Sequence, residues 1–370
     1  MKKKIVYIIS DIQRSVAFEW IADYIDKNRF DISFLILNPG DSNIEEFLRS
    51  NRYQVEHIKC AGKKDWPGAF FSIYSYLRKT KPDAVHCHLQ QATILGLAAA
   101  KLAGVKKRIY TRHHSSLHHI YFPKGIVWDK YSNKLATHIV AISGIVKTIL
   151  TDWEQAPESK IRLIPHGFIL EEFSKIVPEK VEAVESKYEL RGNGPVIGVI
   201  SRFTEWKGVQ YIIPAFKQLV ENYPRATLLL FNASGDYEQV LDGMLAELPE
   251  HSYRKVKFEP EIMSTYHLMD VFVHTPIDEH SEAFGQIYVE ALAAGVPSIF
   301  TLSGIAPDFI VDGENALVVP HQSSDAIYKA MHRLLTDPEL QKKLFTNGKK
   351  SVEAFALGNM LGQLTSLYNE

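Results

Sequence analysis

The sequence predicts an α/β protein built from two doubly wound domains. Short β-branched runs alternate with amphipathic stretches from Ile5 onward, a pattern typical of a parallel sheet covered by helices. The same alternation restarts at Val196. A chain of 370 residues also exceeds what one hydrophobic core usually serves. We therefore expect an N-terminal domain over 1–170, a C-terminal domain over 171–350 and a terminal helical stretch over 351–370.

In each half, the hydrophobic periodicity and the turn residues predict alternating strands and helices. In the first half we expect strands at 4–10, 32–37, 53–58, 84–87, 107–111 and 138–142. Helices are expected between them at 16–27, 44–49, 70–79 and 92–102, with a further helix opening at Ser143 as its N-cap. In the second half we expect strands at 196–201, 226–231, 255–258, 271–274 and 298–301, with helices at 209–221, 237–248 and 286–294. The Pro- and Gly-punctuated segment 164–195 is predicted to be a linker.

The composition is that of a soluble globular protein, with 46% hydrophobic and 23% charged residues. No apolar run approaches eighteen residues, so no membrane-spanning helix is expected, and Asp11 interrupts the apolar start too early for a signal peptide. Cys60 and Cys87 offer neither a disulfide framework nor a metal-ligand spacing. We expect both thiols to be buried and inert, and the protein to be cytoplasmic.

The net charge of −1 conceals an asymmetry between the two halves. Residues 1–170 contain 25 Lys and Arg against 15 Asp and Glu, whereas residues 171–370 contain 17 against 28. Basic residues gather at 63–64, 78–81 and 106–108. Such a face could meet an anionic acceptor or an anionic membrane surface, or it could meet only the acidic half of the same chain.

The stretch 281–297, SEAFGQIYVEALAAGVP, carries the strongest functional pattern. Its helix, 286–294, is apolar on nearly every face and ends at Gly295 and Pro297. Because Phe284 and Gly285 precede it, its first N–H groups should face a loop that lets an anion approach. Glu282 and Glu290, about two turns apart, could bind hydroxyl groups. The stretch therefore predicts a ligand with both phosphate and hydroxyl groups.

Cations and imidazoles follow other predicted strands. Arg202 and Lys207 come after 196–201, where a guanidinium and an ammonium can hold a diphosphate. Histidines 113, 114, 118 and 119 follow 107–111, but no Asp, Glu or Cys lies among them, so we expect no metal site there. His86 and His88 are interpreted as core imidazoles at a strand end.

Three strings resemble retaining glycosyltransferases of the GT-B fold, in particular family 4. They are EAFG with EALAAGVP around Glu290, VISRFTEWKG around Arg202, and TRH ending at His113. The resemblance implies two Rossmann-like domains facing across a cleft, a helix at 351–370 that crosses back to the first domain, and a nucleotide-sugar donor.

The resemblance also implies roles for individual residues. Glu290 would bind ribose hydroxyls and Glu282 the sugar hydroxyls, with the Phe284 and Gly285 N–H groups on sugar or phosphate. His113 would contact the donor sugar near the reacting carbon. Arg202 and Lys207 would stabilise the leaving diphosphate without a metal or other cofactor.

The expected function is transfer of a hexosyl or N-acetylhexosaminyl group, with retention, to a glycan, lipid-linked or small-molecule acceptor, as in polysaccharide biosynthesis. We expect no nucleic-acid partner, and we allow for peripheral association with the inner membrane surface. The alternatives are a nucleotide-sugar epimerase or hydrolase on the same fold and a non-catalytic nucleotide-sugar-binding subunit. One departure from the family bears on the acceptor. Residues 10–14, SDIQR, replace a glycine-rich loop, so Asp11, Gln13 and Arg14 are candidate acceptor contacts.

Overall fold

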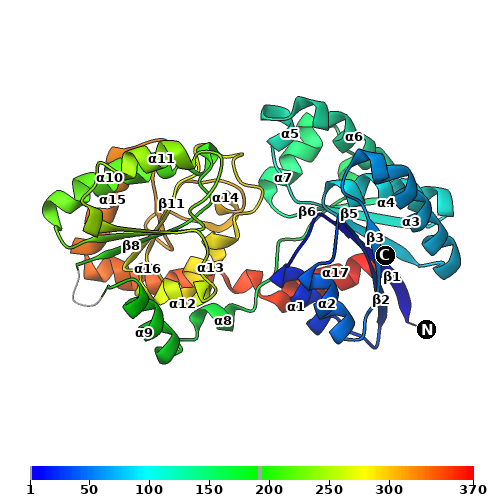
Figure 1. The fold of residues 1–370 in the computed structure, drawn as a ribbon, viewed down its shortest axis with the longest axis horizontal. Helices are drawn as coiled ribbons and strands as arrows, with labels where there is room; N and C mark the ends of the chain where they lie inside the picture. The colour runs from blue at the N-terminus through cyan, green and yellow to red at the C-terminus, as the bar shows by residue number, and fades with distance from the viewer. Residues whose placement is uncertain (1, 191–193) are drawn as a thin grey trace. The chain divides into compact units, whose positions relative to one another are not determined.

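A computed structural model describes residues 2–190 and 194–370. The chain forms two compact units. The N-terminal unit runs to Phe168 and also includes Leu357–Glu370, and the C-terminal unit is Ile169–Ala356. The boundaries expected from the sequence were 170 and 350. Each unit contains one parallel sheet flanked by helices (Figure 1), which confirms the predicted α/β class with two doubly wound domains.

The N-terminal unit has a seven-stranded sheet in the order β3-β2-β1-β4-β5-β6-β7. Its strands are β1 (Lys3–Ser10), β2 (Phe30–Asn38), β3 (Gln54–Lys59), β4 (Ala84–His88), β5 (Lys107–Arg112), β6 (His138–Ala141) and β7 (Ile161–Leu163). β1 pairs in parallel with both β2 and β4. The strand order therefore reverses between β1 and β4, which is the switch point where ligands bind beyond the carboxyl ends of the strands.

Helices cover this sheet, and several were predicted. They are α1 (Val16–Tyr24), α2 (Asn43–Ser50), α3 (Trp66–Thr80), α4 (Gln90–Ala103), α5 (Leu117–Ile120), α6 (Ile126–Leu135), α7 (Gly144–Thr148) and the C-terminal α17 (Leu357–Asn369). The predicted N-cap is confirmed, because the hydroxyl of Ser143 accepts a hydrogen bond of 3.3 Å from the Val146 N–H. Cys60 and Cys87 are buried as expected, and burial raises the pKa of both thiols.

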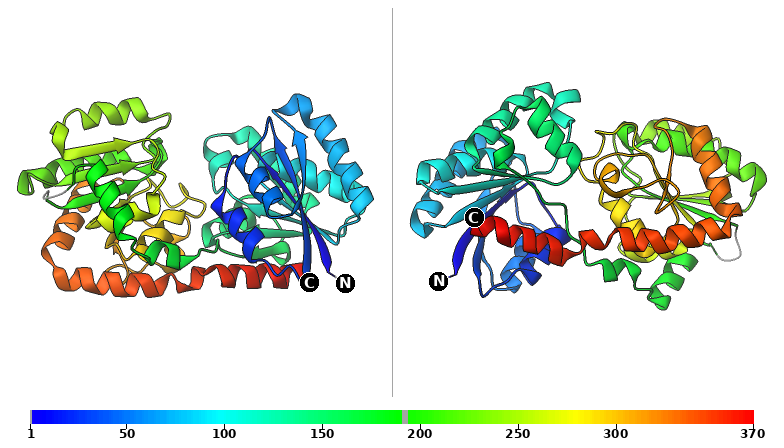
Figure 2. Two further views of the ribbon diagram at one scale, coloured as in Figure 1. Left: turned by 60° about the horizontal axis from the view of Figure 1, so that its bottom comes forward. Right: turned by 180° about the vertical axis from the view of Figure 1, so that it is seen from behind.

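The last helix, α17, packs on the N-terminal sheet. Tyr368 contacts the hydroxyl of Tyr7 and lies 2.8 Å from Nδ1 of His86, while its carbonyl accepts from Nζ of Lys3 at 2.9 Å. In Figure 2 the red C-terminal helix accordingly ends beside the blue first strand. These buried contacts tie the end of the chain to the start of β1.

The C-terminal unit repeats the arrangement with six parallel strands in the order β10-β9-β8-β11-β12-β13. The strands are β8 (Val196–Ile200), β9 (Thr227–Phe231), β10 (Tyr253–Val256), β11 (Val271–His274), β12 (Ser298–Phe300) and β13 (Leu317–Val318). The helices are α8 (Leu170–Ser174), α9 (Pro178–Lys187), α10 (Val209–Asn222), α11 (Glu238–Leu245), α12 (Ile262–Thr265), α13 (Gln286–Ala294), α14 (Ala306–Phe309), α15 (Ser324–Thr336) and α16 (Pro338–Ser351). Here the switch point lies between β8 and β11.

The predicted linker at 164–195 is wrong in most of its length. It contains α8 and α9, which belong to the C-terminal unit. The segment is rich in Glu and Lys, but Val184 and Tyr188 lie four residues apart and are both buried, so its charged residues form the outer face of a helix. The predicted linker also covers residues 191–193, which lie outside the described residues.

No helix in the described part of the chain is long and apolar enough to cross a membrane.

Candidate active site

In the C-terminal unit, the predicted cations lie just beyond the carboxyl end of β8. Arg202 is exposed and makes no ion pair within the described residues, whereas Lys207 is mostly covered. Gly208 follows with φ of +74°, and a Cβ at this position would lie 1.8 Å from the carbonyl oxygen of Thr275. Only glycine allows this close approach, which holds the end of β8 against the loop after β11.

Lys207 forms an ion pair with the buried Glu282. The same carboxylate oxygen of Glu282 lies 3.1 Å from Nε2 of His274 at the end of β11. Burial alone would raise the pKa of Glu282, but the Lys207 charge and the His274 hydrogen bond lower it to about 2. Glu282 is therefore ionised at neutral pH and fixed between a cation and an imidazole. His274 was not among the predicted site residues, although its place at a strand end directly before the signature loop was a usable signal.

The signature loop leads into α13 as predicted, and this helix spans the predicted residues. Gly285 has φ of +81°, and a Cβ there would lie 2.5 Å from the Tyr288 ring. Phe284 is buried, and its carbonyl accepts from the Ile305 N–H at 2.9 Å. The N–H of Glu282 donates to the hydroxyl of Ser303 at 3.0 Å. The loop before the helix is thus held in place by several hydrogen bonds and contacts. The first N–H groups of α13 lack partners within their own helix, as at any helix start.

Glu290 lies on α13 and is partly buried. Its carboxylate accepts a hydrogen bond of 2.8 Å from the hydroxyl of Tyr266. Desolvation raises the pKa of Glu290 to about 7, although the Tyr266 hydrogen bond acts in the opposite direction. The two glutamates of the signature therefore differ, since Glu282 is a fixed anion and Glu290 titrates near neutrality.

In the N-terminal unit, the loop after β1 is exposed at Asp11, Gln13 and Arg14. The Asp11 carboxylate accepts from the Gln91 amide at 3.0 Å, and Arg14 pairs with Glu19 at 3.1 Å. This loop remains available as an acceptor contact, although two of its three polar side chains already have partners.

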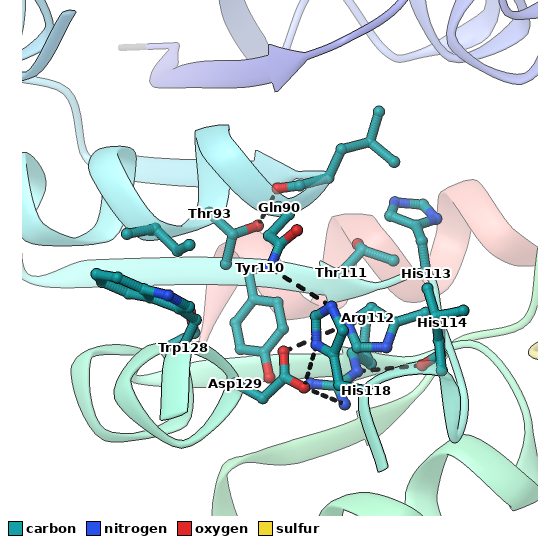
Figure 3. A pocket seen from close by; sticks show the side chains of 14 residues that line it. Gln90, Thr93, Tyr110, Thr111, Arg112, His113, His114, His118, Trp128 and Asp129 are labelled. Atoms are coloured by element: carbon teal, nitrogen blue, oxygen red, sulfur yellow. Dashed lines mark hydrogen bonds and ion pairs between the residues drawn. The ribbon is translucent and has the colours of Figure 1, made fainter. Parts of the chain in front are cut away.

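The predicted histidine cluster divides into two groups. His113 lies beside His88, with 3.1 Å between its Nε2 and Nδ1 of His88. In Figure 3 its ring points away from His114 and His118. Nδ1 of His118 lies 2.7 Å from the carboxylate of Asp129, and Nε2 of His114 lies 3.3 Å from the other oxygen of this carboxylate.

Arg112 lies at the centre of this second group and is almost fully buried. It pairs with Asp129 at 3.1 Å (Figure 3) and with Glu154 at 2.5 Å. Potential ligand atoms of His114, His118 and Asp129 lie within 4.8 Å of one another. The structure thus supplies the carboxylate that the sequence did not show near the histidines. Because Arg112 and the imidazoles already satisfy this carboxylate, the geometry is that of a hydrogen-bonded ion network.

A pocket of about 220 Å³ opens next to this network at the carboxyl ends of β4 and β5. Its walls combine apolar side chains, among them Leu117 and Trp128, with the polar groups of Gln90 and Thr93. Such a mixture is typical of small-molecule sites. The pocket lies wholly within the N-terminal unit.

Comparison with known proteins identifies the family. Residues 180–351 match the glycosyl transferases group 1, and residues 21–172 match glycosyltransferase family 4. The capsular polysaccharide biosynthesis glycosyltransferase CapM of Staphylococcus aureus is 28% identical over 352 residues, covering 88% of this chain and 92% of CapM. An Escherichia coli UDP-Gal:alpha-D-GlcNAc-diphosphoundecaprenol alpha-1,3-galactosyltransferase is 23% identical and covers 98% of this chain and 94% of its own.

Solved structures agree on the fold. Anabaena Alr3699/HepE, crystallised in complex with UDP-glucose, has a TM-score of 0.84 at 19% identity, with 99% of each chain covered. WaaG, a glycosyltransferase involved in lipopolysaccharide biosynthesis, has a TM-score of 0.74 at 12% identity and covers 98% of this chain and 99% of its own. The two family matches together cover residues 21–172 and 180–351, so the chain belongs to the group 1, family 4 glycosyltransferases, and the solved structures show that it has the GT-B fold.

Proposed function

We propose that this glycosyltransferase transfers a hexosyl-type sugar, with retention, from a nucleotide sugar that binds at the carboxyl edge of the C-terminal sheet. The observation that carries the proposal is the convergence of Arg202, the Lys207–Glu282 pair and the start of α13 at one switch point, with Glu290 on the same helix. These groups match a diphosphate flanked by two hydroxyl-rich sugars. The HepE complex with UDP-glucose supports this class of donor.

From the ion pairing we infer different tasks for the two cations. Since Glu282 already neutralises Lys207, Lys207 acts mainly by holding Glu282 as an acceptor for sugar hydroxyls. Arg202, which has no ion-pair partner in the described chain, supplies the net positive charge for the diphosphate. Charge fixed where the leaving group develops its own charge stabilises the transition state, so we propose that no metal is required.

For the acceptor we propose a glycan or lipid-linked sugar that reaches the N-terminal unit near the pocket beside β4 and β5. The E. coli relative acts, by its name, on a diphosphoundecaprenol-linked sugar. Ile120, Phe122 and Val127 are exposed by 49%, 60% and 69%, with Lys124 between them in sequence. Exposed apolar side chains next to a lysine fit an anionic membrane surface, so we propose peripheral membrane association.

The basic clusters contribute unequally to this surface. Lys63 and Lys64 are exposed, as are the basic residues of 78–81. In contrast, Nζ of Lys107 donates to the Leu367 carbonyl at 2.8 Å, and Arg108 donates to the Leu135 carbonyl at 2.9 Å. The 106–108 cluster therefore serves in large part to hold the N-terminal unit together.

The experiment that tests the function measures release of free nucleotide and the anomeric configuration of the product, with and without a lipid-linked acceptor. We expect nucleotide release that depends on acceptor, and an α-linked product from an α-linked donor. Nucleotide release without acceptor would identify a hydrolase or epimerase instead. Donor binding without release of nucleotide would identify a non-catalytic subunit. Arg202→Ala should abolish transfer, whereas Lys217→Ala, which removes an exposed lysine paired with Glu247, is the matched control.

A further inference from the structure

The imidazole of His88 is fixed at the switch point of the N-terminal unit. His88 ends β4, where it is paired in register with Ile9 of β1 and Thr111 of β5. Its ring stacks on Tyr7 at 5.2 Å with an interplanar angle of 14°, and meets Phe18 edge-on at 4.9 Å. Only 4% of the residue is exposed. The ring therefore has little freedom to turn.

His88 and His113 share a single hydrogen-bond proton. Burial holds the pKa of both imidazoles well below the ordinary value, and neighbouring histidines lower each pKa further. Both rings are thus neutral at pH 7, and each carries one N–H. With 3.1 Å between Nδ1 of His88 and Nε2 of His113, one of these nitrogens must donate and the other must accept.

The surroundings of the second ring nitrogen of His88, Nε2, determine which of the two facing nitrogens donates. Its Nε2 is buried and has no hydrogen-bond partner within the described residues. If His113 donated, His88 would have to carry its own proton on this Nε2, which would bury an N–H without an acceptor. Buried N–H groups without acceptors are rarer than unpaired acceptors, and they are costly. The favoured arrangement has Nδ1–H of His88 donating to Nε2 of His113.

This arrangement places the proton of His113 on its other nitrogen. Nδ1 of His113 has no hydrogen-bond partner in the described chain, and the ring is only partly covered. The imidazole of His166 stacks on the His113 ring, with 5.7 Å between the ring centroids and an interplanar angle of 15°. His113 therefore presents an oriented N–H donor instead of a lone pair.

We propose that His88 is a positioning residue that fixes the tautomer of His113, so that Nδ1–H of His113 can donate to a hydroxyl or ring oxygen of the transferred sugar. The second half of this inference rests on the proposed function and on the role that the family resemblance implies for His113, a contact with the donor sugar. A sugar oxygen accepts from an N–H, whereas the opposite tautomer would offer it a lone pair. From its sequence context, His88 was interpreted only as a core imidazole.

The tautomer is read directly from the nitrogen chemical shifts of the full, unliganded chain labelled with ¹⁵N-histidine. Long-range proton–nitrogen correlation distinguishes protonated from unprotonated ring nitrogens, and the His113→Gln variant assigns the signals. We expect His113 to be protonated on Nδ1 and unprotonated on Nε2. A proton on Nε2 of His113 in the wild-type chain would overturn the inference, whatever the variants do.

Two variants test whether His88 is responsible. His88→Phe keeps a ring between Tyr7 and Phe18 but removes the donor, so the two nitrogen shifts of His113 should move toward each other. Phe18→Leu loosens the packing around His88 without removing its hydrogen bond, and it should leave the His113 shifts unchanged. Shifts of His113 that stay the same in a folded His88→Phe protein, as judged by circular dichroism, would refute the positioning role.

Kinetics separate this inference from the proposed function. In His88→Phe we expect kcat to fall by roughly five- to tenfold, the loss of about one hydrogen bond, while affinity for the free nucleotide stays the same. If the tautomer is as expected but kcat is unchanged, the His88–His113 hydrogen bond stands and the contact between His113 and the sugar is refuted. Acceptor-dependent transfer is measured separately on the wild-type enzyme, so failure of the proposed function would be recognised without the variants.

Discussion

Replacing Glu290 by Gln should weaken nucleotide binding and yet increase stability at neutral pH. Glu290 accepts from Tyr266 at 2.8 Å, and burial raises its pKa to about 7. Gln keeps the shape and one acceptor oxygen but cannot ionise. The variant therefore separates the charge that we assign to ribose binding from the packing of α13.

The size of the change in the free energy of unfolding follows from the raised pKa of Glu290. An ordinary Glu has a pKa of 4.5, so below this value both the folded and the unfolded state are protonated. As pH rises from about 4.5 to about 7 the unfolded chain releases its proton first, and the folded state loses up to about 3 kcal/mol of stability. The Gln variant lacks this loss. At pH 8 it should exceed the wild type in free energy of unfolding by up to that amount, whereas at pH 4 the two should be nearly equal.

Binding should change in the opposite direction. Loss of a hydrogen bond to a charged group costs roughly 1.5–3 kcal/mol, so the nucleotide Kd should rise about 10- to 150-fold at pH 8. Wild-type affinity should increase as pH rises through about 7, because the ionised carboxylate is the better acceptor. Calorimetry and urea denaturation at pH 5 and pH 8 measure both effects, with Glu247→Gln as a control at an exposed site. An unchanged Kd would refute the ribose assignment, and a stability difference independent of pH would refute the raised pKa.

Three further predictions follow from other parts of the chain. Turnover should survive EDTA, because Arg202 supplies the positive charge. Loss of activity in EDTA that magnesium or manganese restores would contradict this prediction. Metal analysis of the purified protein would show whether the histidines near Asp129 hold an ion. Tyr368→Phe should lower the free energy of unfolding by about 1–3 kcal/mol, since it leaves buried polar groups of β1 and β4 without their partner; an unchanged denaturation midpoint would argue against this role of α17. The protein should sediment with anionic vesicles at low salt and less at high salt, as expected for a Debye length of about 8 Å at physiological salt. Phe122→Ser should weaken sedimentation, while Lys217→Ala, which removes an exposed lysine of the C-terminal unit, should change it little. Equal binding to neutral and anionic vesicles, or no binding at all, would remove the case for an anionic membrane surface.

The fold was largely readable from the sequence because hydrophobic period is a local property. The helix at 286–294 and the strand at 271–274 match the structure residue for residue. Short elements were missed, and so were the longer helices α6, α15 and α16. β13 has only two residues, α5 has only four, and α9 hides its apolar pair among glutamates and lysines.

The site was predictable only in part, because its partners lie far apart in the chain. Lys207 and Glu282 were each identified, but their ion pair joins residues 75 positions apart. Tyr266, which holds Glu290, comes from an element that the sequence analysis did not predict. Likewise, nothing in the local pattern around Arg112 indicates that the carboxylate of Glu154, 42 residues away, would neutralise it. Such pairings are set by sheet topology.

A thermal-shift panel of UDP-, GDP- and ADP-sugars shows whether the C-terminal unit binds a nucleotide sugar at the end of its sheet. A ligand at a hundred times its Kd should stabilise the protein by about 2.7 kcal/mol. We expect one nucleotide class to raise the melting temperature without added metal, and we expect Arg202→Ala to lose most of this shift. If none of these nucleotide sugars stabilises the wild-type protein, or if Arg202→Ala responds as the wild type does, the proposed donor site is wrong.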